Sequence, residues 1–448
     1  MPSYEAAAVR RVGGEIAVPG DKSISHRSLL LSGIAEGVSE VSGFLPSEDC
    51  LATLAAMRDL GVMIERSGAT DVRVQGRGLR GLRAPARALD MGNAGTAMRL
   101  FTGLLAAQAF DSVLIGDASL TRRPMARVAI PLREMGALIR TSAGTPPLHI
   151  GGGRVLHGIE YRQPVASAQV KSAILLAGLY AGSPTTVHSP ALSRDHTERM
   201  LESFGVRVVN AAATVNGAPV TAESAVTVYP PPRLIGGKIE VPGDFSSAAF
   251  FIVAALLGAD GAGLLIRNVG LNPSRTGLLE ILRRMGGDIT VESERASGAE
   301  PVGDLRIKAS ALRGIEVPTA LVPLSIDELP VLFIAASCAA GETLVTGAGE
   351  LRVKESDRIA AMAAGLKTLG VDHEVLADGM RIAGKSDATA FGGGEIDSCG
   401  DHRVAMSFSV ASVRAAKPIR ILDVANVATS FPGFVALARA VGLELHEL

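Results

Sequence analysis

The stretch GEIAVPGDKSISHRSLLLSGIAEG, residues 14–37, is matched in outline by GKIEVPGDFSSAAFFIVAALLG, residues 237–258. Each copy has a short strand-like segment, then the turn VPGD, then an apolar run of helical length. The first copy carries Lys22, His26 and Arg27 in that run, and the second copy lacks all three. The shared residues therefore indicate a repeated structural unit, and the residues that differ indicate a function carried by the first copy.

A second phrase organises the rest of the chain: an amphipathic stretch that ends in glycine and is followed by a strand-like run. It occurs six times, with its glycines 69 to 84 residues apart. Glycine just past the end of a helix is a common way for the chain to leave it. The glycines are Gly61, Gly136, Gly205, Gly286, Gly370 and Gly442. The spacing predicts six units of roughly 75 residues each.

An apolar segment rich in small residues lies upstream of each glycine phrase. Helices that are apolar on all sides are usually buried, so we expect these segments inside the domains. They are residues 26–35, 96–107, 170–181, 247–257, 329–340 and 402–413. The pattern predicts an α/β protein, and the match between the two VPGD copies predicts two domains of three units. The boundary is expected just before Gly236, and the first 19 residues could pack with either domain.

Composition limits the class of protein. A chain of 448 residues with 47% apolar residues is expected to form two or more domains. Aromatic residues make up 4%, Trp is absent, and 44 Lys and Arg nearly balance 45 Asp and Glu. These values argue against a nucleic-acid partner. The three scattered cysteines, the lack of metal-ligand spacing and the lack of a signal peptide suit a cytoplasmic protein. The apolar runs are shorter than the ~20 residues that span a membrane.

Charged and glycine-rich residues gather where the apolar helices are expected to begin. Backbone N–H groups and the helix dipole make a helix N-terminus suitable for an anion, and Arg suits bidentate binding of phosphate or carboxylate. The Walker glycines are missing, which disfavours ATP, and no nucleophile elbow accompanies the histidines. The pattern favours a small ligand with several negative charges. Taken singly, each of these residues could also be a helix cap or a surface charge.

Two further charged positions are informative. Lys171 enters an otherwise apolar helix, where the alternative is a lysine that reaches solvent. Lys354 and Arg358 are four residues apart, which would place like charges on one face of a helix. That arrangement contributes little to a purely structural helix.

Taken together, the motifs resemble the 5-enolpyruvylshikimate-3-phosphate synthase (EPSP synthase) family. The matching motifs are GDKSISHR at 20–27, GNAGT at 92–96, RPM at 123–125, SAQ at 167–169, RVKESDR at 352–358, DHR at 401–403 and SFP at 430–432. The resemblance extends at least over residues 13–434. The forms SAQVK and RDHTE resemble the second bacterial class of these synthases.

The resemblance implies a two-domain inside-out α/β barrel with six βαβαββ repeats, three in each domain, and with helices inside. The domains would be residues 20–235 and residues 1–19 plus 236–448. The implied reaction moves the enolpyruvyl group of phosphoenolpyruvate to the 5-hydroxyl of shikimate 3-phosphate and releases phosphate. It uses no cofactor or metal, and it lies on the shikimate pathway to chorismate and the aromatic amino acids. The implied protein is a cytoplasmic monomer without nucleic-acid or membrane partners, of the family that glyphosate targets.

The resemblance also implies roles for individual residues. Asp327 would be the base at the 5-hydroxyl, and Glu355 would donate a proton to the methylene carbon and later take one back. Lys22 would contact both substrates and act in catalysis. Shikimate 3-phosphate would be held by Lys22, Ser23, Arg27, Ser167, Ala168, Gln169, Ser193, Asp327 and Lys354. Phosphoenolpyruvate would be held by Lys22, Gly95, Arg123, Gln169, Arg358 and Arg403.

The chain departs from the family pattern in places. Thr429 stands where many members have Lys, residues 272–275 read Asn-Pro-Ser-Arg rather than Asn-x-Thr-Arg, and Gly95 leaves the response to glyphosate open. A sister enolpyruvyl transferase acting on UDP-N-acetylglucosamine would carry a reactive Cys near residues 116–123, and none is there. A noncatalytic anion-binding protein is a further alternative, and it would not need the two carboxylates.

Overall fold

The structure is a computed structural model that describes residues 2–9, 11–215, 218–258, 263–387 and 389–448, without the side chains of residues 211–223. The chain forms two compact units. The first unit is Gly20–Val241, and the second unit is Met1–Pro19 with Pro242–Leu448. The sequence placed the boundary after residue 235. The contacts place it after Val241, because strand β14 (Lys238–Glu240) pairs with β3 (Val38–Ser42) in the first unit.

Three four-stranded sheets are described in the first unit. Their strand orders are β14-β3-β5-β4, β6-β7-β9-β8 and β10-β11-β13-β12. In each sheet the first pair is parallel and the next two pairs are antiparallel. Besides β3 and β14, the strands of the first unit are β4 (Met63–Arg66), β5 (Val72–Gln75), β6 (Leu89–Asp90), β7 (Ser112–Ile115), β8 (Leu138–Ser142), β9 (Thr145–Gly151), β10 (Glu160–Arg162), β11 (Thr185–Ser189), β12 (Val208–Val215) and β13 (Ala218–Val228).

Of the three sheets described in the second unit, two have the same order of one parallel pair and two antiparallel pairs, and the third has the two antiparallel pairs alone. They are β2-β15-β17-β16, β21-β22-β1-β23 and the three-stranded β18-β20-β19. In the three-stranded sheet, Arg313 and Glu316 form isolated parallel bridges to Ala340 and Leu344. These bridges occupy the place that a parallel strand has in the other sheets. The strands are β1 (Ser3–Ala6), β2 (Gly14–Ala17), β15 (Leu264–Gly270), β16 (Asp288–Ser297), β17 (Glu300–Lys308), β18 (Gly341–Val345), β19 (Asp372–Leu376), β20 (Gly379–Gly384), β21 (Gly394–Asp397), β22 (Ile419–Leu422) and β23 (Leu445–Glu447).

The two VPGD copies are the places where the chain passes from one unit to the other. Strand β2 precedes the first copy and pairs with β15 of the second unit, whereas β14 precedes the second copy and pairs with β3 of the first unit. Strand β1 also pairs within the second unit. The pairing therefore places the N-terminal strands with the second unit, a choice that the residues alone left open.

The glycine and the aspartate of VPGD have separate structural roles. A Cβ on Gly20 would lie 1.8 Å from the carbonyl oxygen of Gly43, and a Cβ on Gly243 would lie 2.9 Å from the Val18 side chain. Asp21 and Asp244 cap the following helices by accepting backbone N–H bonds of 2.9 and 2.8 Å. The shared residues of the two copies thus build the turn and the helix start.

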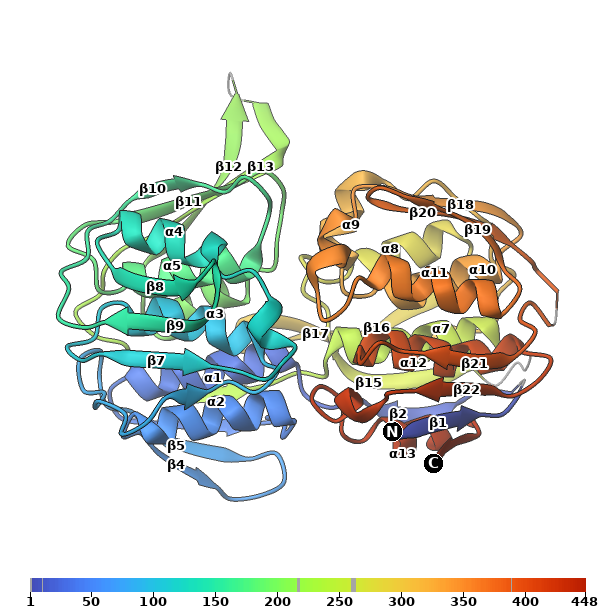
Figure 1. Ribbon diagram of the computed structural model, residues 1–448, viewed down its shortest axis with the longest axis horizontal. Helices are drawn as coiled ribbons and strands as arrows, with labels where there is room; N and C mark the ends of the chain where they lie inside the picture. Colours follow the sequence, from blue (N-terminus) through green and yellow to red (C-terminus); the bar gives the residue numbers. More distant parts are fainter. Residues whose placement is uncertain (1, 10, 216–217, 259–262, 388) are drawn as a thin grey trace. The chain divides into compact units, whose positions relative to one another are not determined.

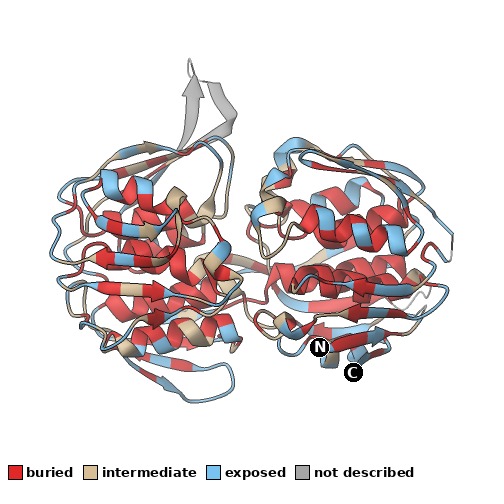
Figure 2. Ribbon diagram, in the orientation of Figure 1, coloured by how far each residue is buried: buried red, intermediate tan, exposed pale blue. Residues whose placement is uncertain are grey.

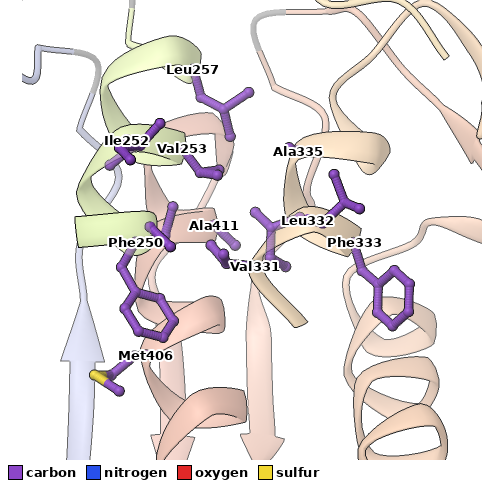
Figure 3. Close-up of a cluster of buried hydrophobic side chains, with 14 of the residues drawn as sticks. Phe250, Ile252, Val253, Leu257, Val331, Leu332, Phe333, Ala335, Met406 and Ala411 are labelled. Carbon is purple, nitrogen blue, oxygen red and sulfur yellow. The ribbon is translucent and has the colours of Figure 1, made fainter. Parts of the chain in front are cut away.

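The six segments predicted as buried helices form buried helices. They are α1 (Lys22–Ile34), α3 (Gly95–Leu105), α5 (Ala168–Gly178), α7 (Phe245–Leu257), α10 (Leu329–Ser337) and α12 (His402–Ala411). All residues of α7, α10 and α12 are buried, and the helices inside each unit are almost entirely buried in Figure 2. Figure 3 shows Phe250 of α7, Val331 of α10 and Met406 of α12 in one apolar cluster. Each unit therefore has three of these buried helices in its core (Figure 1).

The second helix of each predicted unit ends as the glycine phrases predicted. These helices are α2 (Glu48–Asp59), α4 (Ala126–Glu134), α6 (His196–Ser203), α8 (Gly277–Arg284), α11 (Arg358–Thr368) and α13 (Phe434–Ala440). The phrase glycine lies two residues beyond each helix and has φ between +78° and +102°. Glycine reaches this region without the strain that a Cβ would add. The shorter helices are α9 (Val322–Ser325), η1 (Leu120–Arg122), η2 (Thr319–Leu321), η3 (Gly349–Val353), η4 (Ser412–Arg414) and η5 (Ala425–Val427).

A helix that spans a membrane must be long and apolar. In the part of the chain that the structure describes, no single helix is long and apolar enough to cross a membrane. One pair of helices, Thr319–Ser325 and Leu329–Ser337, reaches the length and hydropathy of a span only when the two are taken together. The two helices are bent by 120° relative to each other.

Candidate active site

In the first unit, four cations lie in the first turns of helices α1 and α3 or just after η1. We call Lys22, Arg27, Arg99 and Arg123, with the polar groups bonded to them, the cationic cluster. Lys22 begins α1, and its ammonium lies 2.9 Å from the Asp49 carboxylate. Lys22 keeps 17% of its side chain exposed. The predicted anion site at the start of α1 thus has its lysine in place.

Arg27 is held one turn into α1 by neutral groups. Its Nε donates to Thr197 Oγ1 at 2.6 Å, its Nη2 to Ser172 Oγ at 2.8 Å and its Nη1 to the Ser23 carbonyl at 2.9 Å. The Ser172 and Thr197 hydroxyls are 2.7 Å apart. These three partners orient the guanidinium. Such an arrangement suits a residue that must bind an anion in a defined direction.

Gln169 connects the starts of α3 and α5. Its Nε2 donates to Thr96 Oγ1 at 2.8 Å, and its Oε1 accepts from Arg99 Nη1. Ser167 caps α5 by accepting from the backbone N–H of Val170. The predicted Gln169 therefore lies among the cations, and Ala168 is the first residue of the same helix.

Gly95 allows two arginines to approach the start of α3. A Cβ on Gly95 would lie 2.9 Å from Arg123 Nη1 and 3.2 Å from Arg99 Nη1. Arg123 Nη2 also donates to Asn93 Oδ1 at 2.7 Å. Arg99 and Arg123 are both buried. A larger residue at position 95 would have to displace at least one guanidinium.

Lys171, which enters the apolar helix α5, is paired inside the first unit. Its ammonium forms a 2.6 Å ion pair with Glu198, and the two side chains are 3% and 1% exposed. The same ammonium donates to the Ser193 carbonyl at 3.3 Å. Lys171 is therefore neither solvated nor facing a ligand, and the alternative of a surface lysine is wrong. It fixes the backbone at Ser193, which was predicted to hold shikimate 3-phosphate.

In the second unit, Arg358 gathers three carboxylates. We call this group, with Lys354 and Arg403, the carboxylate cluster. Arg358 Nε donates to Asp401 at 2.8 Å, and its two other nitrogens reach Glu355 at 2.6 Å and Asp327 at 3.3 Å. Burial alone would lower the pKa of Arg358, but Asp401, Glu355 and Asp327 outweigh it and the pKa is raised. Arg358 is 1% exposed, so it holds the carboxylates in place as a permanent cation.

Asp327 contacts all three cations of the carboxylate cluster. One oxygen lies 3.3 Å from both the Lys354 ammonium and the Arg358 guanidinium. Its backbone carbonyl accepts from Arg403 at 2.9 Å. The structure thus brings together all five second-unit residues predicted for the site.

The reason given from the sequence for Lys354 and Arg358 is wrong. They do not share a helical face, because η3 ends at Val353, the backbone of Lys354 is not helical (φ −83°, ψ −148°) and α11 begins at Arg358. They meet through Asp327, which accepts from both. Thr429, at the family's lysine position, donates locally to the Asn426 carbonyl at 2.7 Å.

Several site residues were not predicted from the sequence. They are Asp49, Arg99, Ser172, Thr197, Glu198 and Asp401. Thr197, Glu198 and Asp401 belong to the motifs RDHTE and DHR, so the motifs contained a signal that was not used. Asp49 and Arg99 carried no such signal. No group of three or more His, Cys, Asp and Glu side chains arranged for a metal occurs among the described residues.

The buried histidine of the opening stretch predicts a pH effect on stability. Burial first, and then the charges of Lys22 and Arg27, lower the pKa of His26 to about 3. The unfolded chain therefore binds the proton more strongly, and stability falls as pH decreases from about 6.5 toward 3. Each pH unit in that window is expected to remove roughly 1.4 kcal/mol from the free energy of unfolding.

The measurement is urea unfolding between pH 7 and pH 5. His26→Gln should show a shallower decrease than the unchanged protein, and His149→Gln, at an exposed histidine, should show the same decrease as the unchanged protein. An equal slope in the His26 variant would contradict the assignment of the effect to this ring.

The fold and the two clusters define an α/β enzyme that handles anionic small molecules. A family model described as EPSP synthase (3-phosphoshikimate 1-carboxyvinyltransferase) matches residues 6–437. A 3-phosphoshikimate 1-carboxyvinyltransferase from Methylococcus capsulatus is 58% identical over 444 residues, which cover 99% of this chain and 98% of that protein. One from Alkalilimnicola ehrlichii is 57% identical over 434 residues, covering 96% and 94%. The solved EPSP synthase of Acinetobacter baumannii has a TM-score of 0.87 and 51% identity, with 100% of both chains covered.

This chain belongs to the EPSP synthase family. The family predicted from the motifs is confirmed.

Proposed function

We propose that this protein transfers the enolpyruvyl group of phosphoenolpyruvate to the 5-hydroxyl of shikimate 3-phosphate and releases phosphate. Membership of the EPSP synthase family supports this reaction. The observation in the structure that carries it is the pair of clusters: the four cations of the cationic cluster in one unit, and Asp327 and Glu355 on Arg358 in the other. A noncatalytic anion-binding protein would have no use for the second cluster.

The cationic cluster binds the two anionic substrates in this proposal. Lys22 and Arg27 hold shikimate 3-phosphate with Ser23, Ser167, Gln169 and the Ser193 segment. Arg123, with Gly95 beside it, holds phosphoenolpyruvate, and Lys22 contacts both. Since both substrates are phosphorylated carboxylates, the cations also offset the repulsion between them.

The carboxylate cluster supplies acid–base chemistry on the same substrates. Asp327 takes the proton of the 5-hydroxyl while the oxygen attacks C2 of phosphoenolpyruvate, and Glu355 delivers a proton to the methylene carbon. Glu355 then takes a proton from the new methyl group as the C–O bond to phosphate breaks. Arg358 keeps the two carboxylates in position, and Lys354 and Arg403 add binding charge.

We further propose that the two units are the two domains, each built from three copies of a βαβαββ repeat in an inside-out barrel. The repeated order of one parallel and two antiparallel pairs supports this. The RDHTE and SAQVK forms support the second bacterial class. We place the protein in the cytoplasm as a monomer, which its three free cysteines suit.

The test is phosphate release by the purified protein. We expect release only when phosphoenolpyruvate and shikimate 3-phosphate are both present. Release with UDP-N-acetylglucosamine in place of shikimate 3-phosphate would overturn the proposed substrate. Lys22→Ala should lower kcat/KM roughly 10- to 100-fold, the range for losing a bond to a charged group. Lys308→Ala, at an exposed lysine, is the matched control.

Thr197 gives a test of how Arg27 is held. Thr197→Val removes the acceptor of Arg27 Nε without changing the shape of the side chain. We expect KM for shikimate 3-phosphate to rise about 10-fold while kcat changes little, since the loss affects binding. Thr197→Ser should restore the KM because it restores the oxygen.

The control is Thr186→Val, which removes a 2.8 Å threonine–threonine hydrogen bond elsewhere in the first unit. If both valine variants raised KM equally, the effect would come from a general loss of stability in the first unit. The proposed role of Thr197 in orienting Arg27 would then be wrong.

A further inference from the structure

The first unit contains a cavity of about 490 Å³ that shares no lining residue with the cationic cluster. Its walls include Glu36, just after the end of α1, and Tyr180, just after the end of α5. The cationic cluster lies at the starts of the same two helices. A helix of eleven residues is roughly 16 Å long, so the cavity and the cluster lie at opposite ends of α5. Its volume is that of small-molecule sites in proteins.

One wall of the cavity is the sequence GRGLRG at 76–81, a motif that the proposed function does not use. Its backbone is fixed by hydrogen bonds of 2.9 Å from the N–H groups of Gly76, Arg77 and Gly78 to carbonyls at the end of α1 and just beyond. A Cβ on Gly76 would lie 2.1 Å from the Ala35 carbonyl oxygen, and one on Gly81 would lie 1.8 Å from the Arg77 carbonyl oxygen. The glycines thus let the backbone of this segment approach these carbonyl oxygens closely. Arg77 and Arg80 are therefore attached to a rigid segment.

The charges on this wall are open to a ligand. Within the described chain, neither Arg77 nor Arg80 forms an ion pair with a carboxylate. Arg77 Nε donates only weakly, to the Gly81 carbonyl at 3.4 Å, and Arg80 lies 6.0 Å from the centre of the Tyr180 ring. The carboxylate of Glu36 lies 3.6 Å from Arg233 instead.

Apart from Glu36 and the two arginines, the residues that line the cavity have no charged side chain, and most of them are apolar. The residues Tyr180, Leu79 and the three prolines at 230–232 line the same cavity, and Tyr180 is buried. Prolines have a fixed φ, so this wall is also rigid. Planar guanidinium groups beside an aromatic ring and apolar walls are suited to a carboxylate on a flat apolar body.

We propose that the cavity is a second ligand site that binds a small organic carboxylate with a flat apolar body. Arg77 and Arg80 hold the carboxylate, and Tyr180, Leu79 and the prolines pack against the body. Inorganic phosphate carries the charge but has no body to bury. Two arginines near helix C-termini could also serve only to offset the helix dipoles, and in that case no ligand would bind.

The test is isothermal titration with benzoate, benzamide and inorganic phosphate. We expect saturable binding of benzoate and at least 10-fold weaker binding of benzamide, which lacks the charge, and of phosphate. The Arg77→Ala/Arg80→Ala variant should lose at least 10-fold in benzoate affinity. The Lys22→Ala variant and the Arg87→Ala variant, at an exposed arginine, should keep the affinity of the unchanged protein.

Three results would overturn the proposal. The first is no benzoate binding to the unchanged protein. The second is binding that Lys22→Ala removes and the double arginine variant keeps, which would assign benzoate to the cationic cluster. The third is phosphate binding as strong as benzoate binding, which would mean that the cavity has no preference for an apolar body. Thermal unfolding of each variant checks that it is folded.

Discussion

Asp327→Asn is expected to lower kcat roughly 10²- to 10⁴-fold, the contribution of a positioned general base. Asparagine has the same shape, and its oxygen can still accept from Lys354 and Arg358, which lie 3.3 Å from the carboxylate. What it loses is the capacity to take the proton of the attacking hydroxyl. The measurement is steady-state phosphate release with both substrates at saturation. KM for shikimate 3-phosphate should change much less than kcat.

Two comparisons separate this role from a structural one. Asp378→Asn, at an exposed aspartate of the second unit, should leave kcat unchanged. The Asp327 variant should also lose the acid-side decrease of kcat that a titrating base produces, whereas a merely misfolded site would lower kcat at all pH values alike. A kcat within 10-fold of the unchanged enzyme, with an unaltered pH profile, would contradict Asp327 as the base.

The elements that the sequence predicted best are those fixed by local chemistry. The glycine after each amphipathic helix needs positive φ, and an all-apolar segment needs burial, so both can be recognised without a partner. The domain boundary was less certain, because residues 236–241 are assigned to the first unit by the pairing of β14 with β3. That pairing joins residues almost two hundred positions apart.

Charged residues were harder to interpret because their partners are distant in the sequence. Thr197 is 170 residues from Arg27, and Asp401 is 43 residues from Arg358. Nothing near Lys171 shows that Glu198 will neutralise it. The motifs could therefore indicate which residues matter, while the tertiary fold decides whether each one faces a ligand or another side chain.

In the second VPGD copy, too, the tertiary fold decides what the polar residues contact. Its aspartate, Asp244, caps α7 and also accepts from the buried Arg275 at 3.1 Å. Arg275 donates to Ser246 at 2.7 Å, and Ser246 in turn donates to Glu328. The polar groups at this helix start bond to one another, and the positions that match Lys22 and Arg27 of the first copy are Phe245 and Phe250. The repeated unit therefore keeps its fold when the cations at the helix start are absent.

The buried ion pair between Lys171 and Glu198 is expected to give the largest effect on stability. Glu198→Gln leaves the ammonium of Lys171 buried without a counter-charge, which typically costs about 3–5 kcal/mol in free energy of unfolding. Lys171→Met with Glu198→Leu removes both charges and should recover most of that loss, since well-packed apolar pairs replace buried ion pairs at little cost. Urea unfolding of the three proteins measures the difference.

The neighbouring pair Arg199 and Asp195 provides the control, because it has a similar distance of 2.9 Å but is about 30% exposed. Asp195→Ala should cost less than about 1 kcal/mol, as exposed pairs do. A Glu198→Gln cost no larger than that would contradict the buried pair as a major source of stability. The double apolar variant also separates stability from binding. It should be stable, yet it lacks the ammonium that holds the Ser193 carbonyl, so KM for shikimate 3-phosphate should rise while the free energy of unfolding stays near that of the unchanged protein.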